Sequence, residues 1–328
     1  MMGSGFFARP ERKPVVLAVE IGNLALRGAI FGLDGVARLR RLRPSGPPGD
    51  GVTDRSRALL RELAVDARAN GMEPIAIGIT STGAHTPLAN ILGNELGVPV
   101  VVSTSVAARG LAESFAGPPK EQGNTVFVTV GARVRAAIVS GGSLLAGCTD
   151  SAGELGHLPV MPDGEWCHCG QQGCLEVYFS SEGLVRRYRA FGGPLTIAGA
   201  DIARQQNDDP LCGLLWNEGL RALSLGLAAL TLLVDPAAII LDGNLPQPVP
   251  SFKEAVGSRL ADLLAWRTVP AIRASRLGHG AAQIGTAILA FQAAGHVGIA
   301  SAWDLASASH DPAFTRTSDE YHSWNEDE

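Results

Sequence analysis

The stretch GELGHLPVMPDGEWCHCGQQGCLE, residues 153–176, decides the interpretation of this chain. A histidine is separated by nine residues from a Cys-x-Cys-x-x-x-x-Cys cluster. Three thiolates and one imidazole complete a tetrahedral shell and leave no position for water, as in structural zinc sites. The spacing therefore predicts a structural zinc ion with four ligands: His157, Cys167, Cys169 and Cys174. The turns that bring these ligands together are assigned to three glycines: Gly164, Gly170 and Gly173.

Two alternatives to a structural zinc site are open at this point. The cysteines could form a chance cluster of reduced thiols, or the segment could be a nucleic-acid-binding zinc finger. No basic helix flanks the cluster, and the chain carries a formal net charge of −5, so nucleic-acid binding is not expected. His168 lies between two predicted ligands and is expected to stay outside the ligand set.

The remaining composition is typical of a folded cytoplasmic protein. Hydrophobic residues make up 46% of the 328 residues and charged residues 18%. The N-terminus has only two adjacent apolar side chains, Phe6 and Phe7, where a signal peptide needs a longer run. The apolar run 222–234 is too short to span a membrane. Three clustered cysteines favour metal binding over disulfides.

Hydrophobic periodicity predicts an α/β fold that repeats itself. The apolar runs 15–21 and 24–32 are joined by Gly22-Asn23, and 125–130 and 134–140 by a second turn at Gly131. Each predicted meander is followed by strands that alternate with helices, which favours parallel strands. Further strands are predicted over 75–80, 98–103, 238–241 and 271–275, and helices over 52–70, 87–96, 106–115, 212–234, 252–266 and 281–293.

The GELGH box followed by Cys-x-Cys-Gly-x-x-Gly-Cys-Leu-Glu resembles the signature of the ROK family of sugar kinases and sugar-responsive repressors. More loosely, the resemblance covers residues 15–293. It implies an actin-like, ribonuclease-H-like fold of the hexokinase type, with two lobes, a cleft between them and assembly into a homodimer or homotetramer. The segments expected on this basis are a flexible start (1–13), one lobe (14–104 with 281–293), a second lobe (105–280) that contains the zinc loop (153–176), and a mobile acidic tail (294–328).

The resemblance also assigns sugar-binding positions. In the family, the glutamate and histidine of the GExGH box and the glutamate after the last zinc cysteine bind sugar hydroxyls. These positions are Glu154, His157 and Glu176 here. The alternative is that both glutamates only brace the zinc loop. Further positions matched to the family's sugar site are Thr104, Ser105 and Gly83.

The kinase motifs of the family are lost. The catalytic aspartate is replaced by Ser105, which is no general base near neutral pH. The first phosphate loop reads Glu-Ile-Gly-Asn-Leu-Ala over residues 20–25, and the second reads Gly-Ala-Arg-Val-Arg-Ala over 131–136. The adenosine loop reads Asp-Gly-Asn over 242–244, which places a carboxylate where a nucleotide would bind. These losses argue against ATP and magnesium binding.

The resulting hypothesis is a noncatalytic ROK-like protein that senses a carbohydrate or a sugar-derived metabolite. About fourteen residues precede the first predicted strand, whereas family repressors carry a helix-turn-helix there, so direct operator binding is not expected. The alternatives are a divergent sugar kinase of the glucokinase or N-acetylhexosamine kinase type that uses Glu20, and a structural pseudokinase subunit. Arg133 and Arg135 share one face of a predicted strand and either receive an anionic effector or face solvent.

Overall fold

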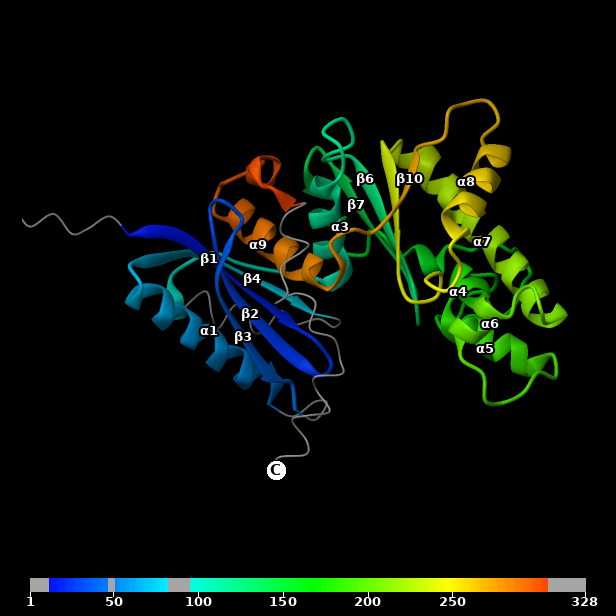
Figure 1. The fold of residues 1–328 in the computed structure, drawn as a ribbon, viewed down its shortest axis with the longest axis horizontal. Helices are drawn as coiled ribbons and strands as arrows, with labels where there is room; N and C mark the ends of the chain where they lie inside the picture. The colour runs from blue at the N-terminus through cyan, green and yellow to red at the C-terminus, as the bar shows by residue number, and fades with distance from the viewer. Residues whose placement is uncertain (1–11, 47–50, 82–94, 306–328) are drawn as a thin grey trace, which may run out of the picture. The chain divides into compact units, whose positions relative to one another are not determined.

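The computed structural model describes residues 12–46, 51–81 and 95–305 of the chain. These residues form two compact units (Figure 1). The first unit contains the described residues up to Ala108 together with Ala282–Asp304. The second unit contains Arg109–Ala281 and Leu305.

The first unit is built on a five-stranded sheet in the order β3-β2-β1-β4-β5. The first three strands form an antiparallel meander, and β4 and β5 extend it in parallel from β1. The hairpin between β1 and β2 closes at Gly22, whose N–H donates to the Ala25 carbonyl at 2.9 Å. The strand bounds are β1 (Lys13–Ile21), β2 (Ala25–Gly32), β3 (Ala37–Pro44), β4 (Met72–Ser81) and β5 (Val100–Thr104).

The second unit repeats this connectivity in the order β10-β9-β6-β7-β8. Here β6, β7 and β8 form the antiparallel meander, and β9 and β10 run parallel to β6. The prediction of a duplicated α/β fold is thereby confirmed. The strand bounds are β6 (Thr125–Val130), β7 (Val134–Ser140), β8 (Ser143–Leu144), β9 (Ala238–Asp242) and β10 (Ala271–Ala274).

Helices cover the sheet of the first unit on both faces. Alternate residues of a strand point to opposite faces, so Ile77 and Ile79 pack with α1 (Val52–Ala69) in one apolar cluster. Gly78 and Thr80 point the other way, toward α9 (Ala281–Ala293). A Cβ atom on Gly78 would lie 2.4 Å from the Thr286 carbonyl oxygen, so glycine permits this close approach.

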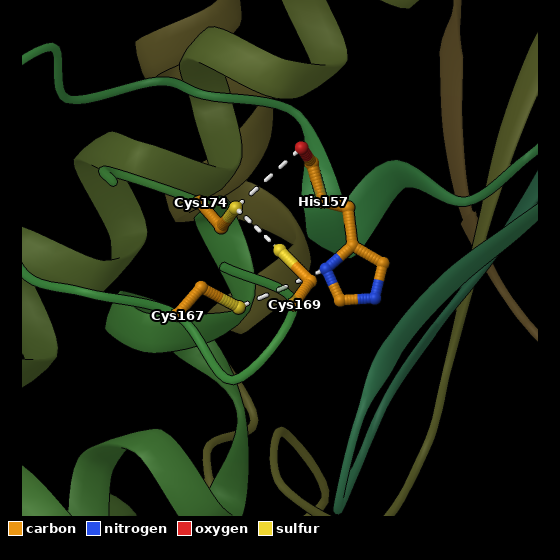
Figure 2. A group of neighbouring side chains, drawn as sticks. All are labelled: His157, Cys167, Cys169 and Cys174. Atoms are coloured by element: carbon orange, nitrogen blue, oxygen red, sulfur yellow. Dashed lines mark hydrogen bonds between the residues drawn. The ribbon is translucent and has the colours of Figure 1, made fainter. Parts of the chain in front are cut away.

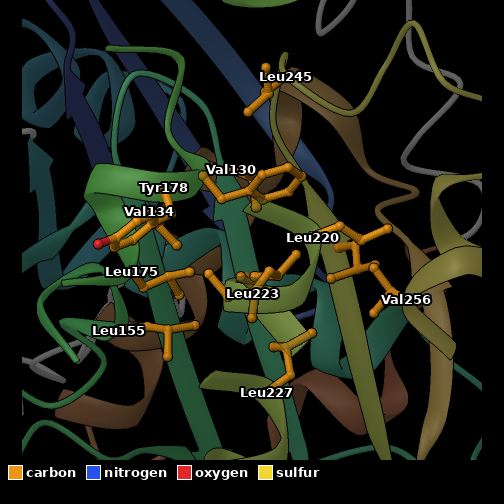
Figure 3. Close-up of a cluster of buried hydrophobic side chains, with 14 of the residues drawn as sticks. Val130, Val134, Leu155, Leu175, Tyr178, Leu220, Leu223, Leu227, Leu245 and Val256 are labelled. Atoms are coloured by element: carbon orange, nitrogen blue, oxygen red, sulfur yellow. The ribbon is translucent and has the colours of Figure 1, made fainter. Parts of the chain in front are cut away.

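Helices of the second unit form the largest apolar core around one face of its sheet (Figure 3). Leu220, Leu223 and Leu227 of α7 (Pro210–Val234) share this core with Val130 and Val134 of the sheet. On the opposite face, Gly110 of α3 (Ser105–Ala116) lies against Phe127 and Ala137. The other helices of this unit are α4 (Leu175–Phe179), α5 (Ser181–Ala190), α6 (Gly199–Arg204), α8 (Phe252–Leu263) and the 3-10 helices η1 (Leu155–His157) and η2 (Gly278–Gly280).

By length and composition, α7 is the one helix of the described residues that would be long and apolar enough to cross a membrane. Half of its most apolar 18-residue segment is buried inside the protein. Leu215, Leu223 and Leu227 of this helix are 0% exposed. Burial in the core of the second unit therefore explains the apolar composition of α7.

The segment after α9 corrects one expectation. Residues 294–304 are not a free tail, because the chain forms η3 (Ile299–Ala302) and then buries Trp303. The Trp303 indole N–H donates to the Leu33 carbonyl at 2.8 Å, and its ring packs edge-on against Phe291. The aromatic side chain holds this part of the chain on the first unit. Residues 306–328 lie outside the described residues.

The outer edge of β7 is covered by two different parts of the chain. The two-residue strand β8 pairs only with Val139 and Ser140. Beyond the end of β8, the start of the 153–176 loop pairs with β7, because the Ala136 N–H donates to the Gly153 carbonyl at 2.7 Å. Gly153 has φ of +94°, and a Cβ atom there would lie 2.1 Å from the Ala136 carbonyl oxygen. The sheet edge and the cysteine loop are therefore one continuous structure.

Candidate metal centre and ligand site

The cysteine loop folds back on itself through backbone hydrogen bonds. The Cys167 N–H donates to the Gln171 carbonyl at 2.8 Å, and the Gly173 N–H donates to the Glu165 backbone carbonyl at 2.9 Å. The Leu175 N–H donates to the Leu158 carbonyl at 3.0 Å, which places the last cysteine beside the segment after His157. These bonds form within the loop itself, so its shape follows from local sequence.

Two of the three glycines that were predicted to bring the ligands together are in crowded positions. Gly173 has φ of +73°, and a Cβ atom there would lie 1.8 Å from the Met161 carbonyl oxygen. Gly164 adopts no positive φ, but a Cβ atom would meet the Tyr178 hydroxyl at 2.0 Å. The predicted role of these glycines in bringing the ligands together is consistent with both constraints.

The loop brings the four predicted metal ligands together (Figure 2). The potential ligand atoms of His157, Cys167, Cys169 and Cys174 all lie within 4.8 Å of one another. The Cys169 and Cys174 sulfurs are 3.6 Å apart, and the Cys167 sulfur is 3.8 Å from His157 Nδ1. Tetrahedral zinc, with Zn–S of about 2.3 Å and Zn–N of about 2.0 Å, would separate its ligands by roughly 3.5–3.8 Å. The donor set and its spacing fit a zinc ion.

The protonation of the thiols depends strongly on whether a cation is present. Burial, followed by the neighbouring cysteines, raises the pKa of Cys174 to about 12. A hydrogen bond from the Gln171 N–H lowers the pKa of Cys169. Three adjacent thiolates repel one another, and a bound divalent cation would offset that repulsion.

His168 is not part of the convergent four-residue set. Its Nε2 accepts from the Arg133 guanidinium at 3.0 Å, and its Nδ1 lies 3.6 Å from a Glu176 oxygen. Its ring packs edge-on against the His157 ring. His157, His168 and Glu176 form a second group whose ligand atoms also lie within 4.8 Å of one another. His168 thus lies between Cys167 and Glu176.

A buried arginine anchors the base of the cysteine loop. The Arg187 side chain is 4% exposed and donates to Glu165 at 2.6 Å and to Glu218 at 2.7 Å. Its guanidinium also lies 4.8 Å from the centre of the Tyr178 ring. These contacts tie the loop to α5 and α7, so the loop is fixed at its base.

The two glutamates matched to the family's sugar site lie beside the metal ligands and face arginines. Glu176 is 7% exposed, accepts from the Val134 N–H at 3.1 Å and lies 3.5 Å from Arg133. The Glu154 side chain is 42% exposed and lies 3.9 Å from Arg135. Both carboxylates belong to the second unit, and a Glu176 oxygen lies within 4.8 Å of a His157 ring nitrogen.

The other matched positions belong to the first unit. Thr104 ends β5, and its hydroxyl accepts from the Ala107 N–H at 3.1 Å, which caps α3. Ser105 is the first residue of α3 and is partly exposed. Gly83 lies outside the described residues, and so does most of the predicted helix over 87–96.

The loops matched to nucleotide binding are tight turns in this structure. In the turn between β6 and β7, the Gly131 N–H donates to the Arg133 carbonyl at 3.0 Å. Asp242, which was expected to face a nucleotide, is paired with Arg109 at 2.6 Å. The side chain of Glu20 lies 3.6 Å from Arg27 on the neighbouring strand. Two of the carboxylates relevant to the kinase question are therefore beside guanidinium groups.

One buried carboxylate was not identified from the sequence. Glu113 of α3 is 2% exposed and accepts from the Ser275 hydroxyl and from the N–H groups of Arg276 and Leu277. Burial raises its pKa. In the sequence it stands among the apolar residues Leu111, Ala112 and Phe115, and this was the available signal.

Comparisons with known proteins identify the relatives of this chain. The Streptomyces coelicolor glucokinase is 27% identical over 84% of this chain and 97% of its own length. The Escherichia fergusonii N-acetylmannosamine kinase is 28% identical over 70% and 82%. The crystal structure of the Thermus thermophilus ROK hexokinase superposes with a TM-score of 0.75, at 27% identity over 85% of this chain and 98% of that one.

These likenesses agree with the fold that was predicted. The two sheets with their flanking helices form the actin-like α/β fold of the ROK sugar kinases. The sequence model of the ROK family matches residues 70–293, which is about two thirds of the chain. This chain belongs to the ROK family.

Proposed function

We propose that this chain is a noncatalytic ROK protein that binds a sugar or sugar-derived metabolite and carries a structural zinc ion. The observation that carries the proposal is Ser105 at the junction of β5 and α3, where the family places its catalytic aspartate. Loss of a general base reduces a rate by roughly 10²–10⁴. The chain keeps the carboxylates that would accept hydrogen bonds from sugar hydroxyls, but it lacks the general base that phosphoryl transfer requires.

The phosphate loops support the same conclusion. Arg133 and Arg135 place large side chains in a loop that the family fills with glycine. Loss of a donor that stabilises transferred phosphate costs roughly another 10²–10³ in rate. Asp242 adds a carboxylate to the loop matched to adenosine binding. ATP and magnesium are therefore not part of the proposal.

The ligand would contact the second unit through Glu154, His157 and Glu176. Carboxylate oxygens accept hydrogen bonds from vicinal hydroxyls, which supports this assignment. Zinc held by the three cysteines and His157 would fix the orientation of the imidazole. Because thiolate ligands must stay reduced, the site fits a cytoplasmic protein.

A divergent sugar kinase is the second candidate, and a specific observation favours it. The glucokinase and N-acetylmannosamine kinase relatives align over most of their lengths. In such an enzyme Glu20 would have to replace the missing base. Its proximity to Arg27 makes it a weaker candidate, because a paired carboxylate attracts a proton less strongly.

The test measures turnover and binding separately. We expect no ADP release above background when the full chain is incubated with magnesium ATP and glucose, N-acetylmannosamine or their 6-phosphates. We expect calorimetry to detect binding of at least one compound, and Glu154→Ala to weaken it about tenfold or more. Turnover that disappears in Glu20→Ala would establish the kinase instead.

The third reading is a structural pseudokinase subunit that binds no small molecule. Absence of binding in every titration, with identical thermal stability in Glu154→Ala and the unsubstituted chain, would favour it. The homodimer or homotetramer implied by the family is tested in the same samples by light scattering.

A further inference from the structure

The family-matched carboxylates do not stand alone in this protein. Arg133 lies 3.5 Å from Glu176, and Arg135 lies 3.9 Å from Glu154. Both arginines come from the β6–β7 hairpin, and Val134 between them is buried at 1% exposure. Arg133 directly precedes β7 and Arg135 lies on it, so both side chains come from one end of this strand. Each carboxylate of the proposed site thus has a cation of its own.

These two contacts differ from the structural arginine of the same unit. Arg187 is 4% exposed and makes hydrogen bonds of 2.6 and 2.7 Å to two glutamates. The Arg133 and Arg135 side chains are 47% and 32% exposed, and their carboxylate contacts are longer than a charge-assisted hydrogen bond of about 2.7–2.9 Å. A guanidinium carries five N–H donors. Arg133 and Arg135 therefore keep N–H donors that are exposed to solvent and can bind a further partner.

The balance of charge decides which ligand fits. A neutral sugar that takes the Glu154 and Glu176 oxygens competes with the arginines and leaves their charge without compensation. A sugar that also carries an anionic group satisfies both sets, because its hydroxyls bind the carboxylates and its anion binds the guanidinium groups. Phosphate and carboxylate match the planar fork of arginine.

We propose that the ligand is a sugar bearing a phosphate or carboxylate group, with the anion bound by Arg133 and Arg135. This inference rests on the proposed sugar site at Glu154 and Glu176. His168 adds a ring nitrogen beside Arg133, at 3.0 Å, and keeps that side chain near the site. In this assignment the substituted phosphate loop has become the part of the site that recognises an anion.

The experiment is calorimetry on the full chain with seven probes. These are glucose, N-acetylmannosamine, the 6-phosphate of each, glucuronate, inorganic phosphate and ATP. We expect the 6-phosphates or glucuronate to bind at least tenfold more tightly than the neutral sugars. A comparison of the two sugar phosphates with glucuronate shows whether the site prefers a phosphate or a carboxylate group.

The variants are Arg135→Gln, Arg133→Gln and the conservative Arg135→Lys, with Arg259→Gln on α8 as a matched control. Arg259 is in the same unit and contacts Asn217, away from the site. We expect Arg135→Gln and Arg133→Gln each to weaken binding of the anionic sugar about tenfold to hundredfold. Neutral sugar binding should be unchanged or tighter, because the substituted arginine no longer competes for the carboxylate. Arg135→Lys should retain part of the preference, and Arg259→Gln should have no effect.

The outcomes separate this inference from the proposed function. If neutral sugars bind as tightly as anionic ones and the arginine variants change nothing, the anionic ligand is excluded while the sugar site stands. If ATP or inorganic phosphate binds with the arginine dependence but no sugar binds, both proposals fail and the site belongs to a nucleotide or free phosphate. If no probe binds, both are likewise overturned.

Discussion

Cys169 is the exposed member of the predicted zinc ligands, so its substitution changes the metal site with little change in packing. We expect Cys169→Ser to lose most of the bound zinc. Loss of a structural metal is among the changes that destabilise by more than about 4 kcal/mol. For a unit of this size that corresponds to a decrease in Tm of roughly 10 °C. Zinc content by atomic emission and Tm by calorimetry check both values.

The matched control is Cys148→Ser. Cys148 is also exposed and lies in the same unit, but it is not a member of the cluster. It should keep the zinc content and Tm of the unsubstituted chain. A purified chain that contains no zinc, with a Tm indifferent to chelators, would contradict the metal assignment.

Two buried glutamates should give pH dependences of opposite sign. Burial raises the pKa of Glu113 above its ordinary 4.5, so its contribution to stability is largest below pH 4.5 and decreases as pH rises. A hydrogen bond from Arg273 lowers the pKa of Glu121, so its contribution is present above pH 4.5 and is lost as pH falls.

The measurement is the Tm difference between the unsubstituted chain and each glutamine variant. From pH 4 to pH 7, this difference should decrease for Glu113→Gln and increase for Glu121→Gln. Each variant should destabilise by roughly 1–3 kcal/mol where its effect is greatest. Slopes of the same sign would refute the assignment of burial as the dominant cause at Glu113.

Which side chains converge was predictable where the partners are close in the chain. His157 and the three cysteines converge because their loop closes on itself within about twenty residues, so spacing carried the information. Glu113 was missed because its partners, Ser275 to Leu277, lie more than 160 positions away. No local pattern in the sequence specifies that contact.

At the scale of elements, the start of α7 shows how a cap decides a helix. The Asp209 carboxylate accepts from the N–H groups of Leu211 and Cys212 at 2.7 and 3.3 Å, and Pro210 occupies the first turn. Its second oxygen accepts from the Tyr188 hydroxyl at 2.7 Å. Asp209→Ala removes both interactions.

We expect Asp209→Ala to destabilise the chain by about 1–3 kcal/mol, because it loses the cap and leaves the Tyr188 hydroxyl without its acceptor. Asp209→Asn keeps one oxygen for the cap, and its amide NH2 can donate to the Tyr188 hydroxyl oxygen, so it should cost less than Asp209→Ala. Thermal unfolding of both variants tests this ranking. Equal stability of the alanine variant and the unsubstituted chain would be the contrary result.

The same elements show the limits of boundary prediction. Periodicity places α7 at residues 212–234, whereas the structure begins it at Pro210 because proline fits the first helical turn. The residue that precedes α1 at its start is Gly51, whose φ of +65° is not marked by any apolar spacing. Apolar spacing determines that a helix forms, and backbone conformation at the junction determines where it starts.

On the scale of the whole molecule, the first unit is completed by a helix from the far end of the chain. Gly78 of β4 lies against the Thr286 backbone of α9, and the hydroxyls of Thr80 and Thr286 are 2.9 Å apart. Gly78→Ala should destabilise by about 1–3 kcal/mol, since overpacking displaces the helix. Differential scanning calorimetry measures this loss.

The matched control is Gly257→Ala in α8, where a Cβ atom would meet only the Ile272 side chain at 3.7 Å. Alanine favours a helix over glycine, so this variant should be neutral or more stable by up to about 1 kcal/mol. If Gly78→Ala is as stable as Gly257→Ala, α9 does not pack tightly on this sheet in solution.

The duplicated architecture was predictable because each half repeats the same local signals. A hairpin turn at Gly22 and another at Gly131 each open a meander, and the alternating strands that follow must pair in parallel. The packing of residues 294–304 was not predictable in this way. It depends on a hydrogen bond from the Trp303 indole N–H to the Leu33 carbonyl, which lies 270 positions earlier in the chain.

The cover over β7 leads to a prediction about association between molecules, if the cysteine loop binds its metal. Beyond the two-residue β8, the strand is shielded by Gly153 at the beginning of the loop that ends in the metal ligands. Stripping the metal would let that segment detach and present an unpaired backbone edge, which invites strand addition from another chain. Chelation should therefore turn a monodisperse solution turbid before the protein unfolds globally.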